Sequence, residues 1–319
     1  MAPGAAVSVN DMPRKTPGPV TVSPEIGRLM RWATYASVGV AVVLIALKTG
    51  AWLMTESIAM LSTLIDSLLD VLASLVNLVA VRHALTPADR EHRFGHGKAE
   101  ALAAVAQSAF IAGSAVLLLF QAGERLLRPR VLAAAEAGIV VMAISIVLTI
   151  ALVLFQIWVI RRTRSVAIAA DSLHYKGDIL ANLAVVAALV LSAWFGWVYA
   201  DPIFGALIAF YILYSAWLIV REALDVLMDR EMPDEDRHRI RAIALAHPEV
   251  TSVHDLRTRR SGPMSFIQFH LVMAADMSLL QAHYVSDAVE IEVRQAFPDA
   301  EVLIHQDPTG IVEKHATFR

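Results

Sequence analysis

The chain has 319 residues, of which 57% are hydrophobic and only 18% are charged, and its net charge at neutral pH is −3. Together with a mean hydropathy of +0.57, this composition excludes an ordinary soluble protein and predicts an integral membrane protein. It gives no support for a nucleic-acid partner. Because cysteine is absent, any metal site has to use nitrogen and oxygen ligands.

The N-terminal residues 1–24 are rich in Pro, Gly, Ser and Val. They contain no apolar stretch of signal-peptide length, so we expect a disordered tail. About 20 apolar residues are needed to cross a bilayer, and residues 25–230 contain six such stretches. These predicted spans lie at roughly residues 30–54, 57–82, 100–126, 131–160, 165–195 and 201–224.

Positive charge predicts which ends of the spans face the cytoplasm. Arg and Lys gather before the first span, after the second and after the fourth. Arg125, Arg128 and Arg130 follow the third span and count against this orientation. The other two loops on that side carry no Lys or Arg, so the balance places both termini in the cytoplasm.

From Met232 the composition changes to that of a small soluble domain, which we predict over residues 231–310, with a short tail at 311–319. The pattern indicates helix, strand, strand, helix and strand. This αββαβ order predicts an α+β sandwich with both helices on one face of a sheet. One strand should bury an alternating row of apolar side chains. That row is Ile267, Phe269, Leu271 and Met273.

Asp66 and Asp70 lie one helical turn apart inside the second predicted span. An Asp at the centre of a membrane helix costs roughly 2.5–3.5 kcal/mol on insertion scales, so a pair needs a reason to be there. Both belong to one polar stripe, which we expect to face protein or water rather than lipid. The stripe also contains Ser62, Thr63, Ser67, Ser74 and Asn77.

The fifth span repeats this arrangement, because His174 and Asp178 are also four residues apart and share one side of a helix. Two facing pairs of this kind offer one imidazole nitrogen and three carboxylate oxygens, which suits a four-coordinate divalent ion such as Zn²⁺. The alternative is that the acids only hold helices together, either through polar neighbours or by pairing with Lys48 or Lys176.

A second group, Asp89, His92 and His96, lies between the second and third spans. The glycines at 95 and 97 favour a loop, in which the three side chains could converge on a metal or simply be solvated.

A third group is spread over the soluble domain. His254 and His270 lie on neighbouring predicted strands, His283 on the following helix, and His305 and Asp307 near the end of the last strand. Each histidine alone is a common surface or core residue, whereas together they indicate shared metal binding.

Several stretches together resemble the cation diffusion facilitator family, and most closely its bacterial zinc and ferrous-iron efflux branch. The stretches are DSLLD, PADREHRFGHGKAEALAA, ADSLHYKGD, VHDLRTRRSGP, FIQFHL and IHQDP. The resemblance extends from about Glu25 to Pro308. Thr309 stands where the branch can carry a Cys, and the Pro-rich extension before Glu25 has no matching segment.

The resemblance implies a homodimer in the lipid bilayer of the bacterial cytoplasmic (inner) membrane, with a metallochaperone-like cytosolic domain. Each protomer would exchange a cytosolic divalent cation for external protons. Zn²⁺ is the first candidate, and Cd²⁺, Fe²⁺, Co²⁺ and Mn²⁺ would tolerate the same ligands.

The resemblance also assigns roles to individual residues. The transport site would be Asp66, Asp70, His174 and Asp178, the loop site Asp89, His92 and His96, and the binuclear cytosolic site His254, His270, His283, His305 and Asp307, with Asp307 as a bridge. Lys98 and Asp229 would form an ion pair at the junction of the membrane and soluble domains, where it would stabilise the dimer.

Metal binding needs deprotonated ligands, so protonation would release the ion, and His174 is expected to carry an exchanged proton. A membrane metalloenzyme is disfavoured, because the sequence contains no HExxH motif. A metal-responsive scaffold or sensor that binds without transporting remains the alternative.

Overall fold

The computed structural model describes residues 22–55, 58–127, 136–195, 197 and 199–311. The predicted N-terminal tail up to residue 21 and the C-terminal residues 312–319 lie outside the described residues. Two compact units are present, one spanning Pro24–Met228 and the other built mainly from the segment that begins at Asp229.

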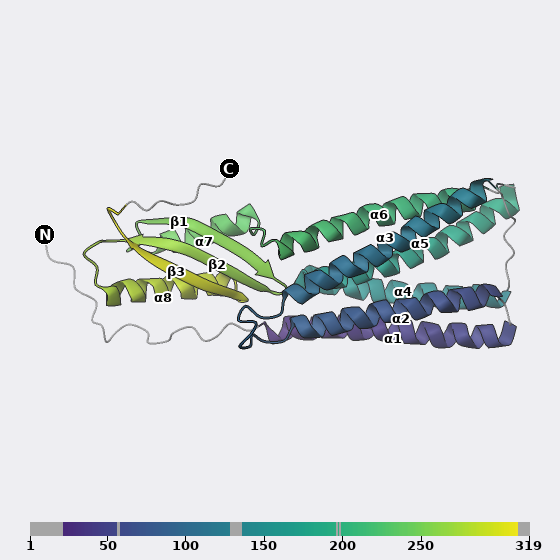
Figure 1. Ribbon diagram of the computed structural model, residues 1–319, viewed down its shortest axis with the longest axis horizontal. Helices are drawn as coiled ribbons and strands as arrows, with labels where there is room; N and C mark the ends of the chain where they lie inside the picture. Colours follow the sequence, from purple (N-terminus) through teal and green to yellow (C-terminus); the bar gives the residue numbers. More distant parts are fainter. Residues whose placement is uncertain (1–21, 56–57, 128–135, 196, 198, 312–319) are drawn as a thin grey trace. The chain divides into compact units, whose positions relative to one another are not determined.

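Six long helices form the first unit (Figure 1). They are α1 (Pro24–Thr55), α2 (Ile58–Ala84), α3 (Lys98–Leu127), α4 (Glu136–Thr163), α5 (Val166–Phe195) and α6 (Ala200–Leu227). Helix α3 packs against α6, α1 packs against α2 and α4, and α5 contacts α3, α4 and α6. Every one of the six predicted spans therefore corresponds to a helix.

Within the described residues, five of these helices contain a segment long and apolar enough to cross a membrane, and α5 is not among them. Helix α5 has 30 residues. Asp171, Lys176 and Asp178 lower the hydropathy of its first half, and several side chains of its second half lie outside the described ones. Its assignment as the sixth span stays a prediction.

Large apolar side chains cover the outside of the first unit. Leu72 is 59% exposed, Phe120 73% and Trp217 62%, whereas Ala104 and Gln156 are completely buried. A bundle with apolar residues outside and small or polar residues between its helices is suited to lipid.

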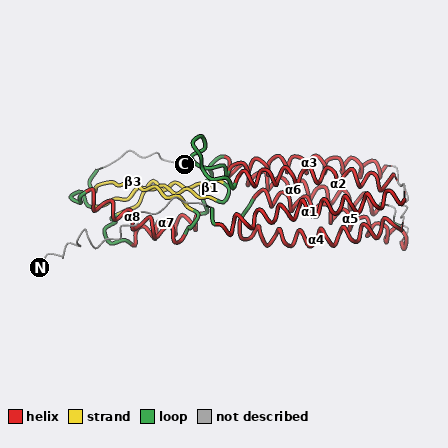
Figure 2. Tube along the Cα trace, turned by 90° about the horizontal axis from the view of Figure 1, so that it is seen from below, coloured by secondary structure: helices red, strands yellow, loops and turns green. Residues whose placement is uncertain are grey.

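The second unit has the predicted element order. Its elements are α7 (Asp234–Ala246), β1 (Ser252–Ser261), β2 (Met264–Met273), α8 (Leu279–Ala296) and β3 (Ala300–Pro308). The sheet order is β1-β2-β3, with β1 antiparallel and β3 parallel to the central β2. Both helices lie along the same side of the three strands (Figure 2).

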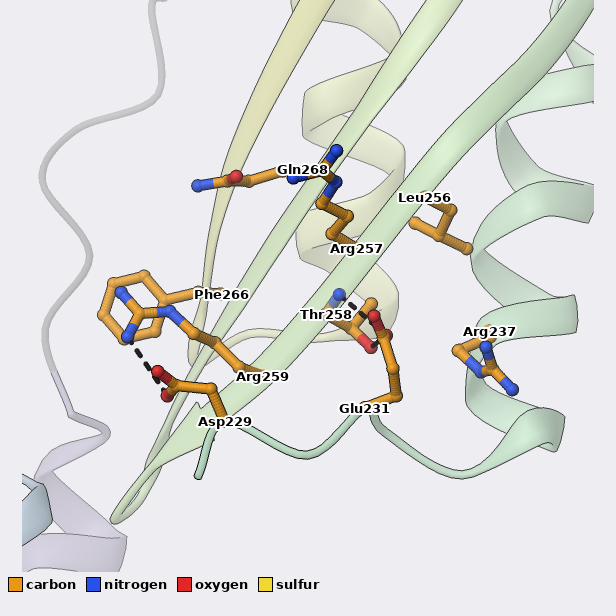
Figure 3. A pocket seen from close by; sticks show the side chains of 9 residues that line it. All are labelled: Asp229, Glu231, Arg237, Leu256, Arg257, Thr258, Arg259, Phe266 and Gln268. Atoms are coloured by element: carbon orange, nitrogen blue, oxygen red, sulfur yellow. Dashed lines mark hydrogen bonds and ion pairs between the residues drawn. The ribbon is translucent and has the colours of Figure 1, made fainter. Parts of the chain in front are cut away.

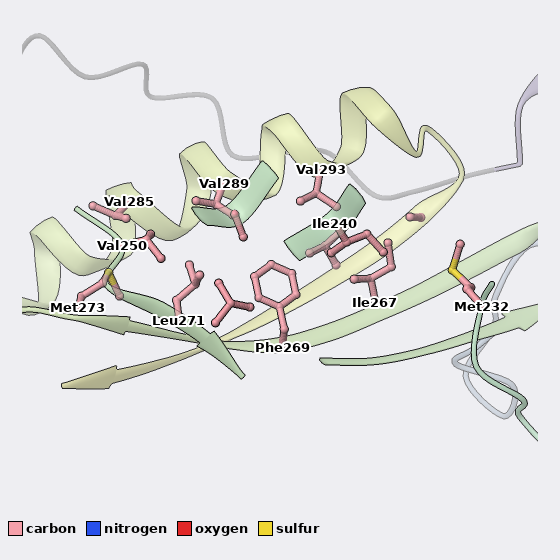
Figure 4. Close-up of a cluster of buried hydrophobic side chains, with 14 residues drawn as sticks. Met232, Ile240, Val250, Ile267, Phe269, Leu271, Met273, Val285, Val289 and Val293 are labelled. Atoms are coloured by element: carbon pink, nitrogen blue, oxygen red, sulfur yellow. The ribbon is translucent and has the colours of Figure 1, made fainter. Parts of the chain in front are cut away.

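One hydrophobic core lies between the sheet and the two helices (Figure 4). The four alternating apolar residues of β2 are all at most 2% exposed, which confirms their predicted inward face. They pack against Val285, Val289 and Val293 of α8 and Ile240 of α7. Because side chains alternate along a strand, His270 of β2 lies on the opposite face of the sheet.

Candidate metal sites

The acidic side of α2 faces the acidic side of α5. His174 Nε2 lies 2.9 Å from Asp70 Oδ1 and 3.9 Å from Asp178 Oδ2. One ligand atom from each of these three residues lies within 4.8 Å of the other two, so small side-chain movements would let one divalent ion contact all three. Asp66 is part of helix α2, but its side chain is not among those that the structure describes.

The polar stripe of α2 points into the protein, as predicted. Ser67, Ser74 and Asn77 are each only 1% exposed. Lys48, one of the alternative partners considered for the acids, donates a hydrogen bond to Ser67 Oγ at 2.6 Å. The side chains of Ser62 and Thr63, two further residues of the predicted stripe, are not among those that the structure describes.

Hydroxyl groups connect α1, α2 and α5 next to this site. Ser74 Oγ lies 3.0 Å from both Ser37 Oγ and the Tyr175 hydroxyl. Tyr175 is completely buried and directly follows His174 in α5. This network therefore holds the rotation of α5 that directs His174 toward α2.

A buried carboxylate connects α5 to two further helices. Asp171 is 1% exposed, and its two oxygens accept hydrogen bonds from Gln107 Nε2 of α3 at 3.1 Å and Gln156 Nε2 of α4 at 2.7 Å. Asp171 lies one turn before His174, so these bonds also position the side of α5 that carries His174. The two glutamines were not predicted, and their only signal in the sequence is a single polar residue within an apolar helix.

The predicted loop cluster is assembled. Asp89 Oδ1 lies 3.3 Å from His92 Nδ1, and Asp89 Oδ2 lies 3.4 Å from His96 Nε2. The backbone N–H of His92 donates to Asp89 Oδ1 at 2.6 Å and the N–H of Glu91 does so at 2.9 Å. The bond from the His92 N–H is the largest cause that holds the pKa of Asp89 below its usual value, so this carboxyl stays anionic and available to a cation.

The His96 ring is oriented by a carbonyl. His96 is 8% exposed, and its Nδ1 lies 3.4 Å from the backbone oxygen of Thr86. If Nδ1 carries the proton toward that oxygen, Nε2 keeps its lone pair on the side of Asp89, which is the usual arrangement behind a metal-binding histidine. The donor set of one carboxylate and two imidazoles therefore fits Zn²⁺.

The strand register places three histidines in one row across the sheet of the second unit. His254 of β1 pairs with His270 of β2, which in turn pairs with His305 of β3. The register shifts directly after His254, and Asp255 there has a φ of +48°. This irregularity was not predicted from the sequence.

Asp307 joins the row of histidines. Its Oδ2 lies 2.8 Å from His270 Nδ1 and 3.2 Å from His254 Nε2, while its Oδ1 lies 3.2 Å from His305 Nε2. Its two oxygens therefore contact different imidazoles, and its role as a bridge between two ions stays a prediction. The compact group of possible ligands consists of His254, His270 and Asp307.

Three residues with predicted roles have other contacts. His283 of α8 is 3.6 Å from Asp287, four residues further on the same helix, and is outside that compact group. Lys98 Nζ donates to the backbone oxygen of Leu227 at 3.3 Å, and Asp229 pairs with Arg259 at 3.3 Å. Lys98 and Asp229 belong to different units, and their ion pair stays a prediction.

A cavity of about 540 Å³ in the second unit is separate from the metal-ligand groups (Figure 3). Its carboxylates have protein partners: Asp229 pairs with Arg259, and Glu231 accepts hydrogen bonds from the backbone N–H and hydroxyl of Thr258. Arg259 also lies over the Phe266 ring, 4.6 Å from its centroid. These contacts account for the two carboxylates of the cavity wall without a metal.

Comparison with known proteins agrees with this arrangement. Residues 34–228 match the cation efflux transmembrane domain, and residues 232–309 match the cytoplasmic domain of cation efflux proteins. The chain is 50% identical to the cation-efflux pump FieF of Klebsiella pneumoniae over 286 residues, which cover 90% of this chain and 95% of that protein. The cation-efflux pump FieF of Shewanella oneidensis is also 50% identical, over 88% of this chain and 95% of that protein.

Among solved structures, the metal-bound C-terminal domain of the CzcD transporter from Thermotoga maritima is 30% identical, with coverage of 26% of this chain and 100% of that chain and a TM-score of 0.25.

The helical bundle and the appended α+β unit define a multi-pass membrane protein with a C-terminal cytoplasmic-type domain. The chain belongs to the cation efflux family, also called the cation diffusion facilitator family.

Proposed function

We propose that this protein exports a divalent metal cation across the bacterial cytoplasmic membrane in exchange for protons. The convergence of Asp70, His174 and Asp178 between two helices of the bundle is the observation that carries this proposal. Asp66 lies one turn before Asp70 and is proposed as the fourth ligand. The names of the relatives, which are cation-efflux pumps, support the same direction of transport.

Proton exchange follows from competition for the same lone pairs. Carboxylates and imidazoles bind a metal when they are deprotonated, so metal binding releases protons and protonation releases the metal. An empty site with three carboxylates in a low-dielectric bundle would carry unfavourable negative charge, which either protons or a cation neutralise. A proton gradient can therefore drive release of the metal on the outer side.

The ligand types favour Zn²⁺ as the first substrate. Mixed carboxylate and imidazole sites with four ligands suit Zn²⁺ and Cd²⁺, and Fe²⁺, Co²⁺ and Mn²⁺ accept the same donors. The metal selected in the cell then depends on site geometry and metal availability as well as affinity.

Both termini are proposed to be cytoplasmic. Arg28 and Arg31 lie at the start of α1, Arg82 at the end of α2, and Arg161 and Arg162 at the end of α4. The contrary charge of Arg125 is compensated, because its Nη1 lies 2.5 Å from Asp201 Oδ2. The remaining contrary residues, Arg128 and Arg130, lie outside the described residues.

The loop and the sheet are proposed to hold resident metal ions, because each offers nitrogen and oxygen donors grouped within 4.8 Å. Metal at His254, His270 and Asp307 would connect β1, β2 and β3. Such ordering could favour association of two copies of the chain and shift the membrane unit between its conformations. His283 and His305 are proposed to complete this site, and Lys98 and Asp229 to support the dimer.

Transport is tested with purified protein in liposomes, by measuring uptake of Zn²⁺, Cd²⁺, Fe²⁺, Co²⁺ and Mn²⁺ across an imposed pH gradient. Metal movement with counterflow of protons is the expected result. Metal binding without any movement would contradict export and would favour the scaffold or sensor function.

A further inference from the structure

A fourth histidine lies beside the loop cluster. His83, in the last turn of α2, has its ring centroid 4.6 Å from that of His96, with an angle of 61° between the rings. The His96 ring is in turn 4.5 Å from that of His92. Three imidazoles from the end of a helix and the following loop therefore lie next to one another, and two of them, His92 and His96, contact the Asp89 carboxylate.

The three predicted ligands leave a coordination position open. Asp89, His92 and His96 supply one oxygen and two nitrogens, whereas structural zinc sites usually have four protein ligands. His83 is outside the group whose ligand atoms lie within 4.8 Å of one another, so binding would require its ring to turn. It is exposed, and an exposed side chain at a helix end can change rotamer at little cost.

We propose that His83 is the fourth ligand of the loop metal site, with Asp89, His92 and His96 as the other three. This inference rests on the loop site of the proposed function. Because His83 belongs to α2 and Lys98 begins α3 two residues after His96, the bound ion would connect the end of one helix to the start of the next. The same helix α2 carries Asp70, so the ion would stabilise the scaffold of the transport site.

Ring packing alone is the competing explanation, and a phenylalanine separates the two. His83→Phe keeps an aromatic ring against His96 but removes the nitrogen that could bind a metal. The full-length chain carrying His174→Ala and His270→Ala serves as background, because these changes remove ligands from the other two clusters. Asp89→Ala in that background reports loss of the loop site, and His238→Ala, which changes an exposed histidine of α7, is the control.

Zn²⁺ affinity is measured in detergent by competition with a chelating dye, and the visible spectrum of bound Co²⁺ reports the ligand set. We expect His83→Phe to weaken Zn²⁺ binding at least about tenfold, since even a residue that only hydrogen-bonds to a metal ligand contributes that much. Its Co²⁺ spectrum should also change, whereas His238→Ala should resemble the background. Circular dichroism checks that each variant keeps its helix content.

Three outcomes would overturn the assignment. If His83→Phe binds Zn²⁺ as tightly as the background while Asp89→Ala does not, the contact with His96 is ring packing only. If the Co²⁺ spectrum of His83→Phe equals that of the background, His83 is not a ligand even where the affinity changes. If Asp89→Ala removes no bound metal, the loop site itself is absent, a result that leaves metal export in liposomes as a separate question.

Discussion

His174 and Asp70 are 104 residues apart in the sequence, yet His174 Nε2 lies 2.9 Å from Asp70 Oδ1. One partner belongs to α5 and the other to α2, so a shift between these helices would change the distance between the two proposed ligands. Each partner is largely buried, with 12% and 17% of its side chain exposed. The proposed transport site is therefore placed where a change in helix packing would alter metal affinity.

Asp70→Asn should abolish metal uptake without unfolding the protein. The amide has nearly the same shape and can still accept a hydrogen bond from His174, but it removes an anionic ligand. We expect uptake in liposomes to fall at least about a hundredfold. This is more than the loss of a residue that only hydrogen-bonds to a metal ligand would cause. Asp201→Asn, at the start of α6, is the matched control and should retain uptake. Equal rates in the Asp70→Asn variant and the unmodified protein would exclude Asp70 as a ligand.

Gln107→Ala should destabilise the membrane unit. It leaves Asp171 Oδ1 without the amide that now donates to it at 3.1 Å, and an unpaired buried acceptor costs about 1–3 kcal/mol. The thermal midpoint of unfolding in detergent should therefore fall. Gln121→Ala is the control, because Gln121 lies on the same helix but is exposed. Similar midpoints for the two variants would show that the contact with Asp171 adds no stability.

The approach of Asp70 to His174 and Asp178 could be predicted because four-residue spacing places ionisable residues on one side of a helix, and burying them in an apolar span is costly. The supporting residues could not. Gln107 and Gln156 come from α3 and α4, and a single polar residue carries no signal of which helix supplies its partner. Their roles depend on how the helices pack in three dimensions.

In the second unit, too, some features could be predicted from the sequence and others could not. Alternation along β2 predicted the buried face, and therefore the opposite face for His270. The irregularity after His254 depends on backbone conformation at Asp255, where φ is +48°, and its residue type does not require that value. The contact of His283 with Asp287 likewise depends on a side-chain rotamer rather than on a sequence pattern.

His270→Ala should remove metal-dependent protection of the sheet. A ligand present at a hundred times its dissociation constant stabilises the folded state by about 2.7 kcal/mol, so Zn²⁺ should slow amide exchange in β1–β3 about a hundredfold. The measurement is hydrogen exchange of the full-length chain with and without Zn²⁺. The His270→Ala variant should lose this effect, because it lacks the imidazole whose Nδ1 lies 2.8 Å from Asp307 Oδ2 in the unmodified protein.

His283→Ala tests whether His283 is a ligand of the proposed cytosolic metal site or keeps its contact with Asp287 when metal is bound. If His283 binds metal as the family resemblance implies, the variant should lose protection by Zn²⁺ as His270→Ala does. If its contact with Asp287 persists when metal is bound, protection should stay close to that of the unmodified protein. His247→Ala, outside the cluster, controls for general effects of removing a histidine.

Gly177→Leu should impair transport by disturbing the contact between α5 and α6. Even a Cβ at Gly177 would lie 3.1 Å from Ile212 Cδ1, so a leucine side chain would overpack this contact, and overpacking an interior typically costs about 1–3 kcal/mol. Gly177 directly precedes Asp178, so the displacement would occur beside a proposed ligand. We expect liposome uptake of Zn²⁺ to fall several-fold in Gly177→Leu and to fall less in Gly177→Ala, where a small shift of the end of the Ile212 side chain would make room for the methyl group. Gly113→Ala is the matched control, since its Cβ would have no atom within 4 Å and helix propensity favours alanine by about 1 kcal/mol. Equal uptake by Gly177→Leu and Gly113→Ala would show that α5 can move away from α6 without affecting the site.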